Sequence, residues 1–482
     1  MTATPPPGSP APSAAVPGAS KTERGQFSLD VERPNVADAF RAYIGRLRSG
    51  DPGALPSILG LIVLVLIFNQ ISGRFLSKIN IGNLPGQGAY IAIIALGIVF
   101  VLLLGEIDLA AGTTGGMAAC YAAQALFSRG LDNGVPGFFY WVTIIAMAAA
   151  ALLGAWLKLI SGPALVVLGI ILLLTGADDH VIPALIIALA IGASVGIFTG
   201  WLVAKVGIPS FIVTLALFLA WQGVVLYILN SQPINVSRYS FWNDLANGNM
   251  KPVWGWVFVI VLLGGYLAYT LWRALSAQRR GLAGDSIQLV LTRFGALAVV
   301  GIVAVWFFNQ NRNPNAGAEI KGVPWAASVP VALMIVLTLA LTKTTWGRHL
   351  FATGGNAEAA RRAGIDVVKI KVSAFTLSST VAALGGVFLA SQQGSANLSI
   401  GGGNILLFAV AAAVIGGTSL FGGRGRPRDA VIGAIVIAII PNGLGLKPSL
   451  AIHPEYQQII TGAVLLLAAA VDALSRRRAR AS

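Results

Sequence analysis

Apolar runs of roughly 20 residues recur along almost the whole chain, and they constrain its fold more than any other feature. A helix needs about 20 apolar residues to cross the hydrocarbon core of a bilayer. With 56% of its 482 residues apolar and only 11% charged, the chain lacks the polar surface that a soluble protein of this size needs. The sequence therefore predicts an all-α, polytopic membrane protein with about 14 candidate transmembrane helices, some of them broken or re-entrant. The candidates are 55–75, 87–105, 109–127, 138–159, 163–177, 181–203, 208–228, 253–274, 290–309, 324–343, 372–391, 404–421, 428–446 and 456–474.

Basic residues orient these predicted spans. If the N-terminus is cytoplasmic, 25 of the 33 Lys and Arg residues fall in inner segments and 8 in outer segments. Cytoplasmic loops of membrane proteins carry such an excess of positive charge. We therefore expect a multi-pass protein of the cell membrane with both termini in the cytoplasm. The net charge of +15 is then explained by the excess of basic residues on the inner side of the membrane, and we expect no nucleic-acid partner.

The chain divides into a long membrane region between two tails. Residues 1–54 form a Pro-rich, then polar, cytoplasmic tail that we expect to begin disordered, 55–475 form the transmembrane domain, and 476–482 form a basic cytoplasmic tail. No loop is long enough to fold as an enzyme domain. The P-loop motif is missing, and one Cys and three dispersed His offer no metal site. We expect no enzymatic activity and no metal or cofactor bound by the chain itself.

An acidic pair, Glu106 and Asp108, stands between two apolar runs in the segment GEIDLAAGTTGG (105–116). Its glycines, Gly112 among them, predict a break in the helix, and irregular backbone at membrane depth must be buried in protein or line a cavity. An intramembrane carboxylate indicates a functional site. The alternative is that the pair lies at the inner surface and caps a helix, which the predicted topology favours.

The most basic inner loop, 344–371, contains a predicted short helix. Asn356 is a good N-cap, 357–363 are mostly strong helix formers, and Gly364 suits the C-terminal stop. Ala359, Ala360 and Ala363 are expected to form a ridge of small residues beside Arg361 and Arg362. Such a helix could dock in a groove of another protein, or it could be an ordinary inner loop.

Three further segments suggest close packing or polar contacts. Gly192, Gly196 and Gly200 form a double G-x-x-x-G, which predicts a helix–helix contact face. Pro209 and Ser210, followed by Phe211, indicate the start of a helix. The stretch 391–423 has two features. Its first part carries the uncharged polar residues Gln392, Gln393, Asn397 and Asn404, which could hydrogen-bond sugar hydroxyls or could form a flexible loop. Its second part carries Gly416, Gly417, Gly422 and Gly423, which indicate a broken helix or close packing.

Four of these segments together resemble the permease subunits of ATP-binding-cassette importers for ribose, galactose and xylose. They read GEIDLAAG (105–112), GIPSFIVTL (207–215), GRHLFATGGNAEAARRAGI (347–365) and VIGGTSLFGG (414–423). Ala110 stands where the family usually has Ser. The acidic EID and the basic loop WRALSAQRRGLAG (272–284) make the chain look most like xylose permeases. The stretch 138–178 looks like an inserted pair of helices, and the 54-residue tail is also extra.

The resemblance implies a permease that forms the path for a monosaccharide, D-xylose or a related pentose or hexose. Its implied partners are a second permease copy, an ATPase subunit that binds the ATP, and an extracytoplasmic sugar-binding protein. The ATPase-coupling loop would include Gly354, Gly355, Asn356, Glu358, Ala359, Ala360, Arg361 and Gly364. The pore or gate would include Glu106, Asp108, Gly112, Pro209, Ser210, Phe211, Gln392, Asn404, Gly416, Gly417 and Thr418.

Other classes of protein remain open on the sequence. An ion- or proton-coupled sugar carrier would need coupling sites at the membrane midplane, for which only Glu106 and Asp108 are candidates. A membrane-embedded transferase would need an acidic cluster facing a loop, which the sequence lacks. A permease of the same superfamily for branched-chain amino acids or nucleosides would share the motifs but not the sugar.

Overall fold

The computed structural model describes residues 55–280, 285–315 and 317–447, with isolated helical residues between 37 and 45 and between 455 and 466. Within these residues the regular structure is helical, apart from one antiparallel pair of two-residue strands and an isolated bridge between Asn249 and Pro324, which confirms the all-α prediction. The elements are α2 (Leu55–Ser72), α3 (Lys78–Leu103), α4 (Ala111–Ser128), α5 (Leu131–Gly134), α6 (Gly137–Trp156), α7 (Ser161–Leu174), η1 (Ala177–Asp179), α8 (Val181–Trp201), η2 (Leu202–Val206), α9 (Ser210–Ile228), β1 (Ile234–Asn235), α10 (Ser240–Asn247), α11 (Pro252–Arg279), α12 (Ile287–Asn309), α13 (Trp325–Lys343), α14 (Thr345–Gly355), α15 (Ala357–Arg362), α16 (Val367–Gln393), β2 (Ser395–Ala396), α17 (Ile405–Gly416) and α18 (Pro427–Gly445).

Nine helices of the described part are long and apolar enough to cross a membrane, namely α3, α6, α8 continued by η2, α9, α11, α12, α13, α16 and α18. Every predicted run from 55 to 446 coincides with a helix. Several boundaries differ. Helix α3 begins at Lys78, well before the predicted 87, and run 404–421 gives only the 12-residue α17. Helix α11 continues to Arg279, beyond the predicted 274, and α16 begins at Val367, before the predicted 372. Most of run 456–474 and both tails lie outside the described residues. The pair predicted at 138–178 is present as α6 and α7, while its being an insertion stays a prediction.

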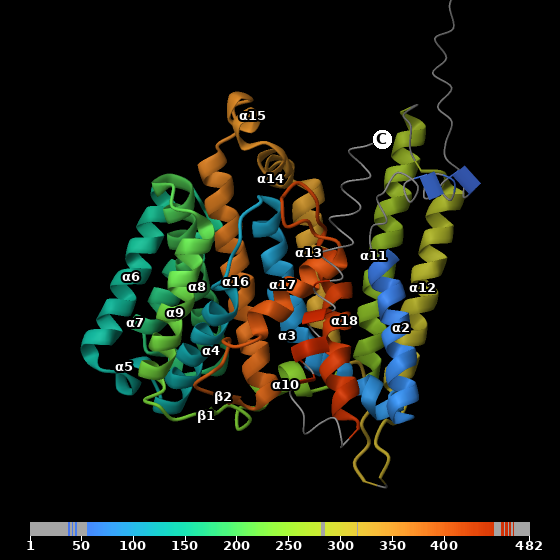
Figure 1. Ribbon diagram of the computed structural model, residues 1–482, viewed down its shortest axis with the longest axis horizontal. Coiled ribbons are helices and arrows are strands. Elements are labelled where there is room, and N and C mark those ends of the chain that lie inside the picture. Colours follow the sequence, from blue (N-terminus) through green and yellow to red (C-terminus); the bar gives the residue numbers. More distant parts are fainter. Residues whose placement is uncertain are drawn as a thin grey trace, which may run out of the picture.

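The connections separate into two ends of the molecule (Figure 1). One end carries α14, α15 and the link between α17 and α18. It also carries the C-terminal end of α11 and the N-terminal end of α12. The opposite end carries α10, the β1–β2 pair and the loop between α12 and α13. These two sets are the segments that the charge count assigned to the inner and outer sides. We therefore call them the inner and outer ends.

Helix α16 runs through the middle of the bundle and packs against α3, α4 and α8. Its contact with α8 depends on the predicted glycine face. A Cβ on Gly196 would lie 2.5 Å from the Phe375 carbonyl oxygen, and a Cβ on Gly192 would lie 2.6 Å from that of Ser379. The double G-x-x-x-G is thus confirmed as a close backbone contact. Such contacts matter in a membrane, because lipid is as apolar as the helices and close packing, not the hydrophobic effect, must hold the helices together.

Two segments between helices of the bundle are not helical. A break was predicted in the first, and the second lies in the stretch predicted to be polar. The link 104–110 runs from the inner end of α3 down to α4 (Figure 1), and the loop 397–404 precedes the short α17. The break was predicted at the glycines, but Gly112 and Gly116 lie inside α4. They instead let the second segment approach that helix: a Cβ on Gly112 would lie 2.6 Å from the Gly401 carbonyl oxygen, and one on Gly116 would lie 2.1 Å from that of Ile400. The irregular backbone at Ile400 and Gly401 is therefore packed against α4, and burial in protein is the condition under which membranes tolerate such backbone.

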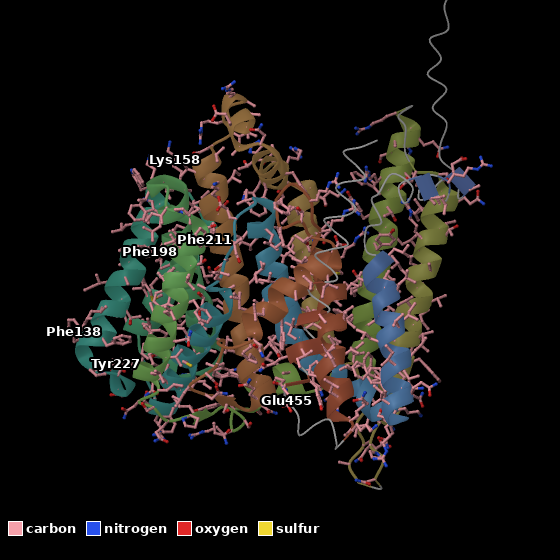
Figure 2. The ribbon with its side chains drawn as sticks, in the orientation of Figure 1. Phe138, Lys158, Phe198, Phe211, Tyr227 and Glu455 are labelled. Carbon is pink, nitrogen blue, oxygen red and sulfur yellow. The ribbon has the colours of Figure 1, made fainter. Side chains whose placement is uncertain are left out.

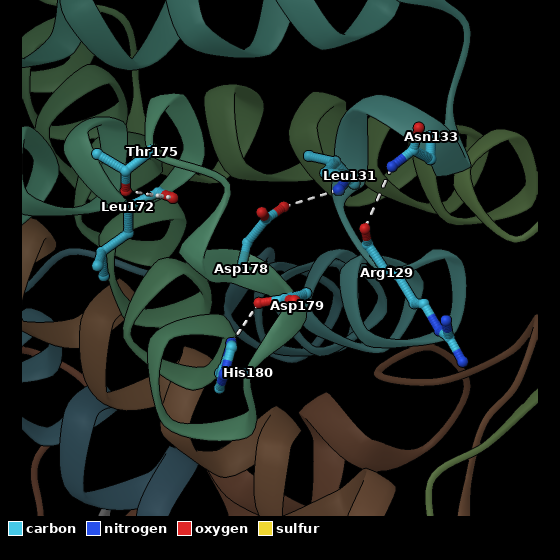
Figure 3. A network of polar contacts seen from close by, with 8 residues as sticks. All are labelled: Arg129, Leu131, Asn133, Leu172, Thr175, Asp178, Asp179 and His180. Atoms are coloured by element: carbon cyan, nitrogen blue, oxygen red, sulfur yellow. Dashed lines mark hydrogen bonds and ion pairs between the residues drawn. The ribbon is translucent and has the colours of Figure 1, made fainter.

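Polar contacts tie the helix ends together at the outer end. The Leu131 amide donates a 2.7 Å hydrogen bond to the carboxylate of Asp178, which joins α5 to η1 (Figure 3). Burial raises the pKa of Asp178, and the Leu131 hydrogen bond offsets part of this rise. The indole of Trp242 on α10 donates to the Val387 carbonyl oxygen at 2.9 Å, which holds α10 against α16. These contacts fix the outer ends of the helices that frame the site.

We expect Gly196→Val to destabilise the protein, because the new side chain meets the α16 backbone and the two helices must separate. Overpacking of this kind costs about 1–3 kcal/mol. The measurement is the thermal unfolding temperature of the purified protein in detergent. The matched control is Gly264→Val on α11, where nothing lies within 4 Å of an added Cβ. Equal unfolding temperatures for the two variants would contradict the packing account.

Candidate functional site

The carbonyl oxygen of Leu103, at the inner end of α3, is the point at which the distant motifs meet. The Gly423 amide donates to it at 2.9 Å. A Cβ on Gly354 would lie only 1.9 Å from the same oxygen, and a Cβ on Gly422 would lie 2.9 Å from both the Gly105 nitrogen and the Gly354 oxygen. Three of the four motifs therefore touch through backbone alone. We call these five residues the inner hub.

The fourth motif joins the inner hub through the link 104–110. The Ile107 amide donates to the Ser210 hydroxyl at 3.1 Å, and the Thr214 hydroxyl donates to the Ile107 carbonyl oxygen at 3.3 Å. These bonds hold the first turn of α9 against the link. Glu106, next to Ile107, forms an ion pair with Lys371 near the start of α16. The link is thus bonded to both α9 and α16.

Asp108 is buried, with 3% of its surface exposed. Its Oδ1 accepts a hydrogen bond from the Ala110 amide at 3.0 Å, and its Oδ2 lies 3.5 Å from the Ser378 hydroxyl on α16. The Ala110 amide belongs to the residue directly before α4, so Asp108 lies near the start of that helix without capping its first turn. Glu106 caps no helix either, because it pairs with Lys371. The Ser378 contact of Asp108 positions α4 against α16. Asp108 and Glu106 have separate partners and do not form a joint carboxylate site.

The predicted helix in the inner loop is confirmed as α15. The Asn356 side chain accepts a hydrogen bond from the Ala359 amide at 2.9 Å, and Gly364 ends the turn with φ +84°. Glu358 pairs with Arg361 at 2.9 Å and with Arg362 at 3.2 Å along the exposed face. Such pairs stabilise a short helix by a few tenths of a kcal/mol each. Sequence analysis missed α14, the helix before α15.

One part of the docking prediction is wrong. Ala360 does not belong to an accessible ridge, because it is buried with 4% of its surface exposed. Ala359 and Ala363 are exposed. The helical period turns Ala360 toward the body of the protein, a direction that the sequence alone did not reveal. The exposed face of α15 is therefore formed by alanines and by the Glu358–arginine pairs.

The glycines at the end of α17 are packing and turning residues. A Cβ on Gly416 would lie 1.8 Å from the Asp429 carbonyl oxygen on α18, and Gly417 ends the helix with φ +117°. Thr418 follows, buried, and its hydroxyl has no hydrogen-bond partner within the described residues. From here the chain runs to Gly422 and Gly423 in the inner hub.

The remaining predicted site residues lie elsewhere. Pro209 is the N-cap of α9, next to Ser210. Phe211, labelled in Figure 2, is about half exposed and does not join the inner hub. Gly112 is at the contact with Gly401, and Asn404 directly precedes α17. Gln392 lies near the outer end, so the structure divides the predicted set between two places.

Gln392 lines a hollow of about 430 Å³ near the outer end. Side-chain amides dominate its polar lining, together with the guanidinium group of Arg312. Such groups offer neutral donors and acceptors that suit hydroxyl-rich ligands. We call this hollow the outer pocket. Its other lining residues are Gly82, Asn83, Gly86, Gln87, Ala246, Asn247, Asn249, Ile320 and Pro324.

Arg312 is the residue of the outer pocket that sequence analysis missed. Only 4% of its surface is exposed, and burial lowers its pKa. Its Nη2 donates to Asn249 at 2.7 Å and its guanidinium lies over the Phe308 ring, but no carboxylate within the described residues pairs with it. A buried, unpaired charge is costly. The space beside α3 exists because position 82 is glycine.

The outer pocket continues into the bundle through an amide ladder between α3 and α18. Asn80 and Asn442 exchange hydrogen bonds of 2.8 and 2.9 Å, and Asn442 also donates to Gln87 at 3.0 Å. Gln87 lines the pocket. Paired amides satisfy one another inside an apolar bundle, where an unpaired one would be costly. This ladder could not be predicted from the sequence, because each of its amide residues stands alone within an apolar run.

Comparisons with known proteins agree with the arrangement of the motifs. A family model described as "Branched-chain amino acid transport system / permease component" matches residues 158–469. The xylose transport system permease protein XylH of Escherichia coli is 32% identical over 430 residues, which cover 87% of this chain and 92% of the relative. XylH of Haemophilus influenzae is 29% identical, with 90% and 99% covered.

A ribose permease is also similar. The ribose import permease protein RbsC of Escherichia coli is 27% identical over 420 residues, covering 86% of this chain and 92% of the relative. No solved structure matches the chain. The family match and the near full-length similarity to sugar permeases agree with the four motifs in the sequence. The chain belongs to this family of multi-pass membrane permeases, as a permease subunit of the ATP-binding-cassette monosaccharide importer type.

Proposed function

We propose that this protein forms the membrane path of an importer for D-xylose or a related monosaccharide, powered by ATP hydrolysis on a separate ATPase subunit. The observation that carries the proposal is the inner hub beneath the projecting helix α15, where three separated motifs meet and to which the link 104–110 attaches the fourth. A partner subunit that binds α15 and changes shape would therefore move the inner ends of α3, α9, α16 and α17 together. ATP binds to the partner subunit, and this chain needs no cofactor of its own.

In this proposal α14 and α15 carry the force. The ATPase grips the exposed face of α15, and Gly354 passes the movement to Leu103 through direct backbone contact. The Glu106–Lys371 ion pair transmits it to α16, which runs from the inner to the outer end. Rigid movement of helices around a fixed path is the usual form of alternating access. The distribution of basic residues supports a cytoplasmic position for both termini in this proposal.

The outer pocket is the proposed entrance for the sugar. A binding protein outside the membrane delivers it there, and a second copy of the permease completes the path. Amide groups and Arg312 can exchange hydrogen bonds with sugar hydroxyls in place of water. A site that hydrogen-bonds a polar ligand rejects analogues that leave its own groups unpaired.

A second candidate substrate is a branched-chain amino acid, because the description of the matching family model names one. The relatives that cover most of the chain are named for xylose and ribose. The amide-lined outer pocket suits a polyol better than an aliphatic side chain, which gains from apolar surroundings. We therefore put the sugar first.

Uptake by reconstituted vesicles tests the proposal. The full chain, its ATPase subunit and its binding protein are reconstituted, and uptake of labelled D-xylose is followed with and without ATP. We expect uptake only with ATP and the ATPase, competition by related pentoses and none by leucine. Uptake driven by an ion gradient without the ATPase would identify a secondary carrier and overturn the proposal, and leucine uptake would overturn the choice of substrate.

The docking role of α15 has its own test. Ala359→Glu places a charge on the exposed face without touching the buried side of the helix. We expect the ATPase subunit to copurify about tenfold less well, because an unpaired charge buried in the interface costs at least the ~1.4 kcal/mol that tenfold represents. Gln278→Glu at the inner end of α11 is the control, because it adds the same charge at another exposed inner position. Equal copurification of both variants would place the ATPase contact elsewhere.

A further inference from the structure

An apolar groove lies on the side of the bundle that α6 and α7 build. Its volume is about 530 Å³. Helices α4 and α8 form its floor, and α6 and α9 form its walls. Almost all of its lining is apolar, and Val142, Ala146, Ala149 and Phe198 on its rim are exposed. The groove therefore opens sideways, toward the surroundings of the helices, and not toward the inner hub or the outer pocket.

Small residues on α6 keep this groove open. Ala146, Ala149 and Ala150 face it where larger apolar residues would fill the space. Lining residues from Phe139 to Leu153 span about 21 Å of α6 at 1.5 Å per residue, enough for one extended acyl chain. One leaflet of the hydrocarbon core is about 15 Å deep, half of the roughly 30 Å total. An occupant of the groove thus reaches deeper than an ordinary lipid beside the protein.

The two ends of the groove differ. Aromatic rings close the outer end, because Phe139 stacks on Tyr121 with 6.3 Å between ring centroids and packs at a tilt against Tyr227 with 4.7 Å between centroids. The inner end instead carries cations. Lys205 lies over the Trp156 ring at 5.7 Å, one turn beyond the lining residue Trp201. An occupant with an apolar tail would enter from the inner end.

A second cation, Lys158, lies at the same end. In Figure 2 it lies at the inner end above Phe198, whereas Phe138 and Tyr227 lie toward the outer end. Lys158 and Lys205 are both exposed, and no carboxylate within the described residues pairs with either one. Basic side chains at this depth attract the phosphate of an anionic lipid.

We propose that the groove between α6 and α9 binds one anionic phospholipid of the inner leaflet, with an acyl chain along α6 and the phosphate at Lys158 and Lys205. The apolar lining suits the acyl chain, the closed outer end suits the end of that chain, and the cations at the open inner end suit the phosphate. This gives α6 a role in holding a lipid against the bundle. The inference is independent of the proposed sugar and of the ATPase.

Photocrosslinking in nanodiscs tests the site with the full chain. The probes are phosphatidylglycerol and phosphatidylcholine that carry a diazirine on one acyl chain, and adducts are mapped by peptide mass spectrometry. We expect adducts concentrated between Val142 and Leu153 on α6 and between Ser194 and Trp201 on α8. Phosphatidylglycerol should give several-fold more of them than phosphatidylcholine, because only its headgroup carries net negative charge.

Two pairs of variants separate the site from ordinary lipid contact. Ala146→Phe should fill the groove and remove its adducts, whereas Ile145→Phe on the neighbouring exposed position should not. Lys158→Gln with Lys205→Gln should abolish the preference for phosphatidylglycerol.

Arg273→Gln with Arg279→Gln removes the same charge from the inner part of α11 and should leave that preference intact. Adducts spread evenly over α6, α11 and α12, and unchanged by Ala146→Phe, would overturn the proposal. So would a groove that stays unlabelled because a second protein copy covers it.

Discussion

The contact of backbones around the Leu103 carbonyl oxygen is the interaction on which the functional arrangement depends. Gly354 and Gly423 approach this oxygen from two different segments, and a side chain on Gly354 would occupy the same space as the oxygen. Backbone contacts of this kind hold elements at a fixed spacing, because no rotamer can change to absorb a displacement. The inner hub is therefore suited to pass movement from α15 to the helices of the bundle.

The membrane sets the second constraint. Two irregular segments, 104–110 and 397–404, pack against helices of the bundle, and each polar group that they bury needs a partner inside the protein. Asp108 bonds to Ala110 and contacts Ser378, and Ile107 bonds to Ser210 and Thr214. The same hydrogen bonds that make the break in the helix tolerable also attach it to α9 and α16. The same atoms therefore stabilise the irregular link and connect it to the helices that would move with it.

Much of this organisation could be predicted from the sequence. Apolar runs gave the helices, the Asn356 cap and Gly364 gave α15, and the period of glycines on α8 gave its contact face, because each pattern reflects a local rule. The burial of Ala360 and the meeting of three motifs around Leu103 could not be predicted, since both depend on how distant helices pack. Arg312 gave no signal either, because a single arginine in an outer loop looks like any exposed residue until α3 and Asn249 cover it.

Neighbouring glycines offer the most direct test of the inner hub as a coupling element. An added methyl group at Gly354 must push α14 away from Leu103, whereas at Gly355 it meets nothing within 4 Å. The measurement is sugar taken up per ATP hydrolysed by the reconstituted complex. The account predicts that Gly354→Ala lowers this ratio while ATP hydrolysis continues, and that Gly355→Ala matches the unmodified protein. An unchanged ratio in Gly354→Ala would contradict the account.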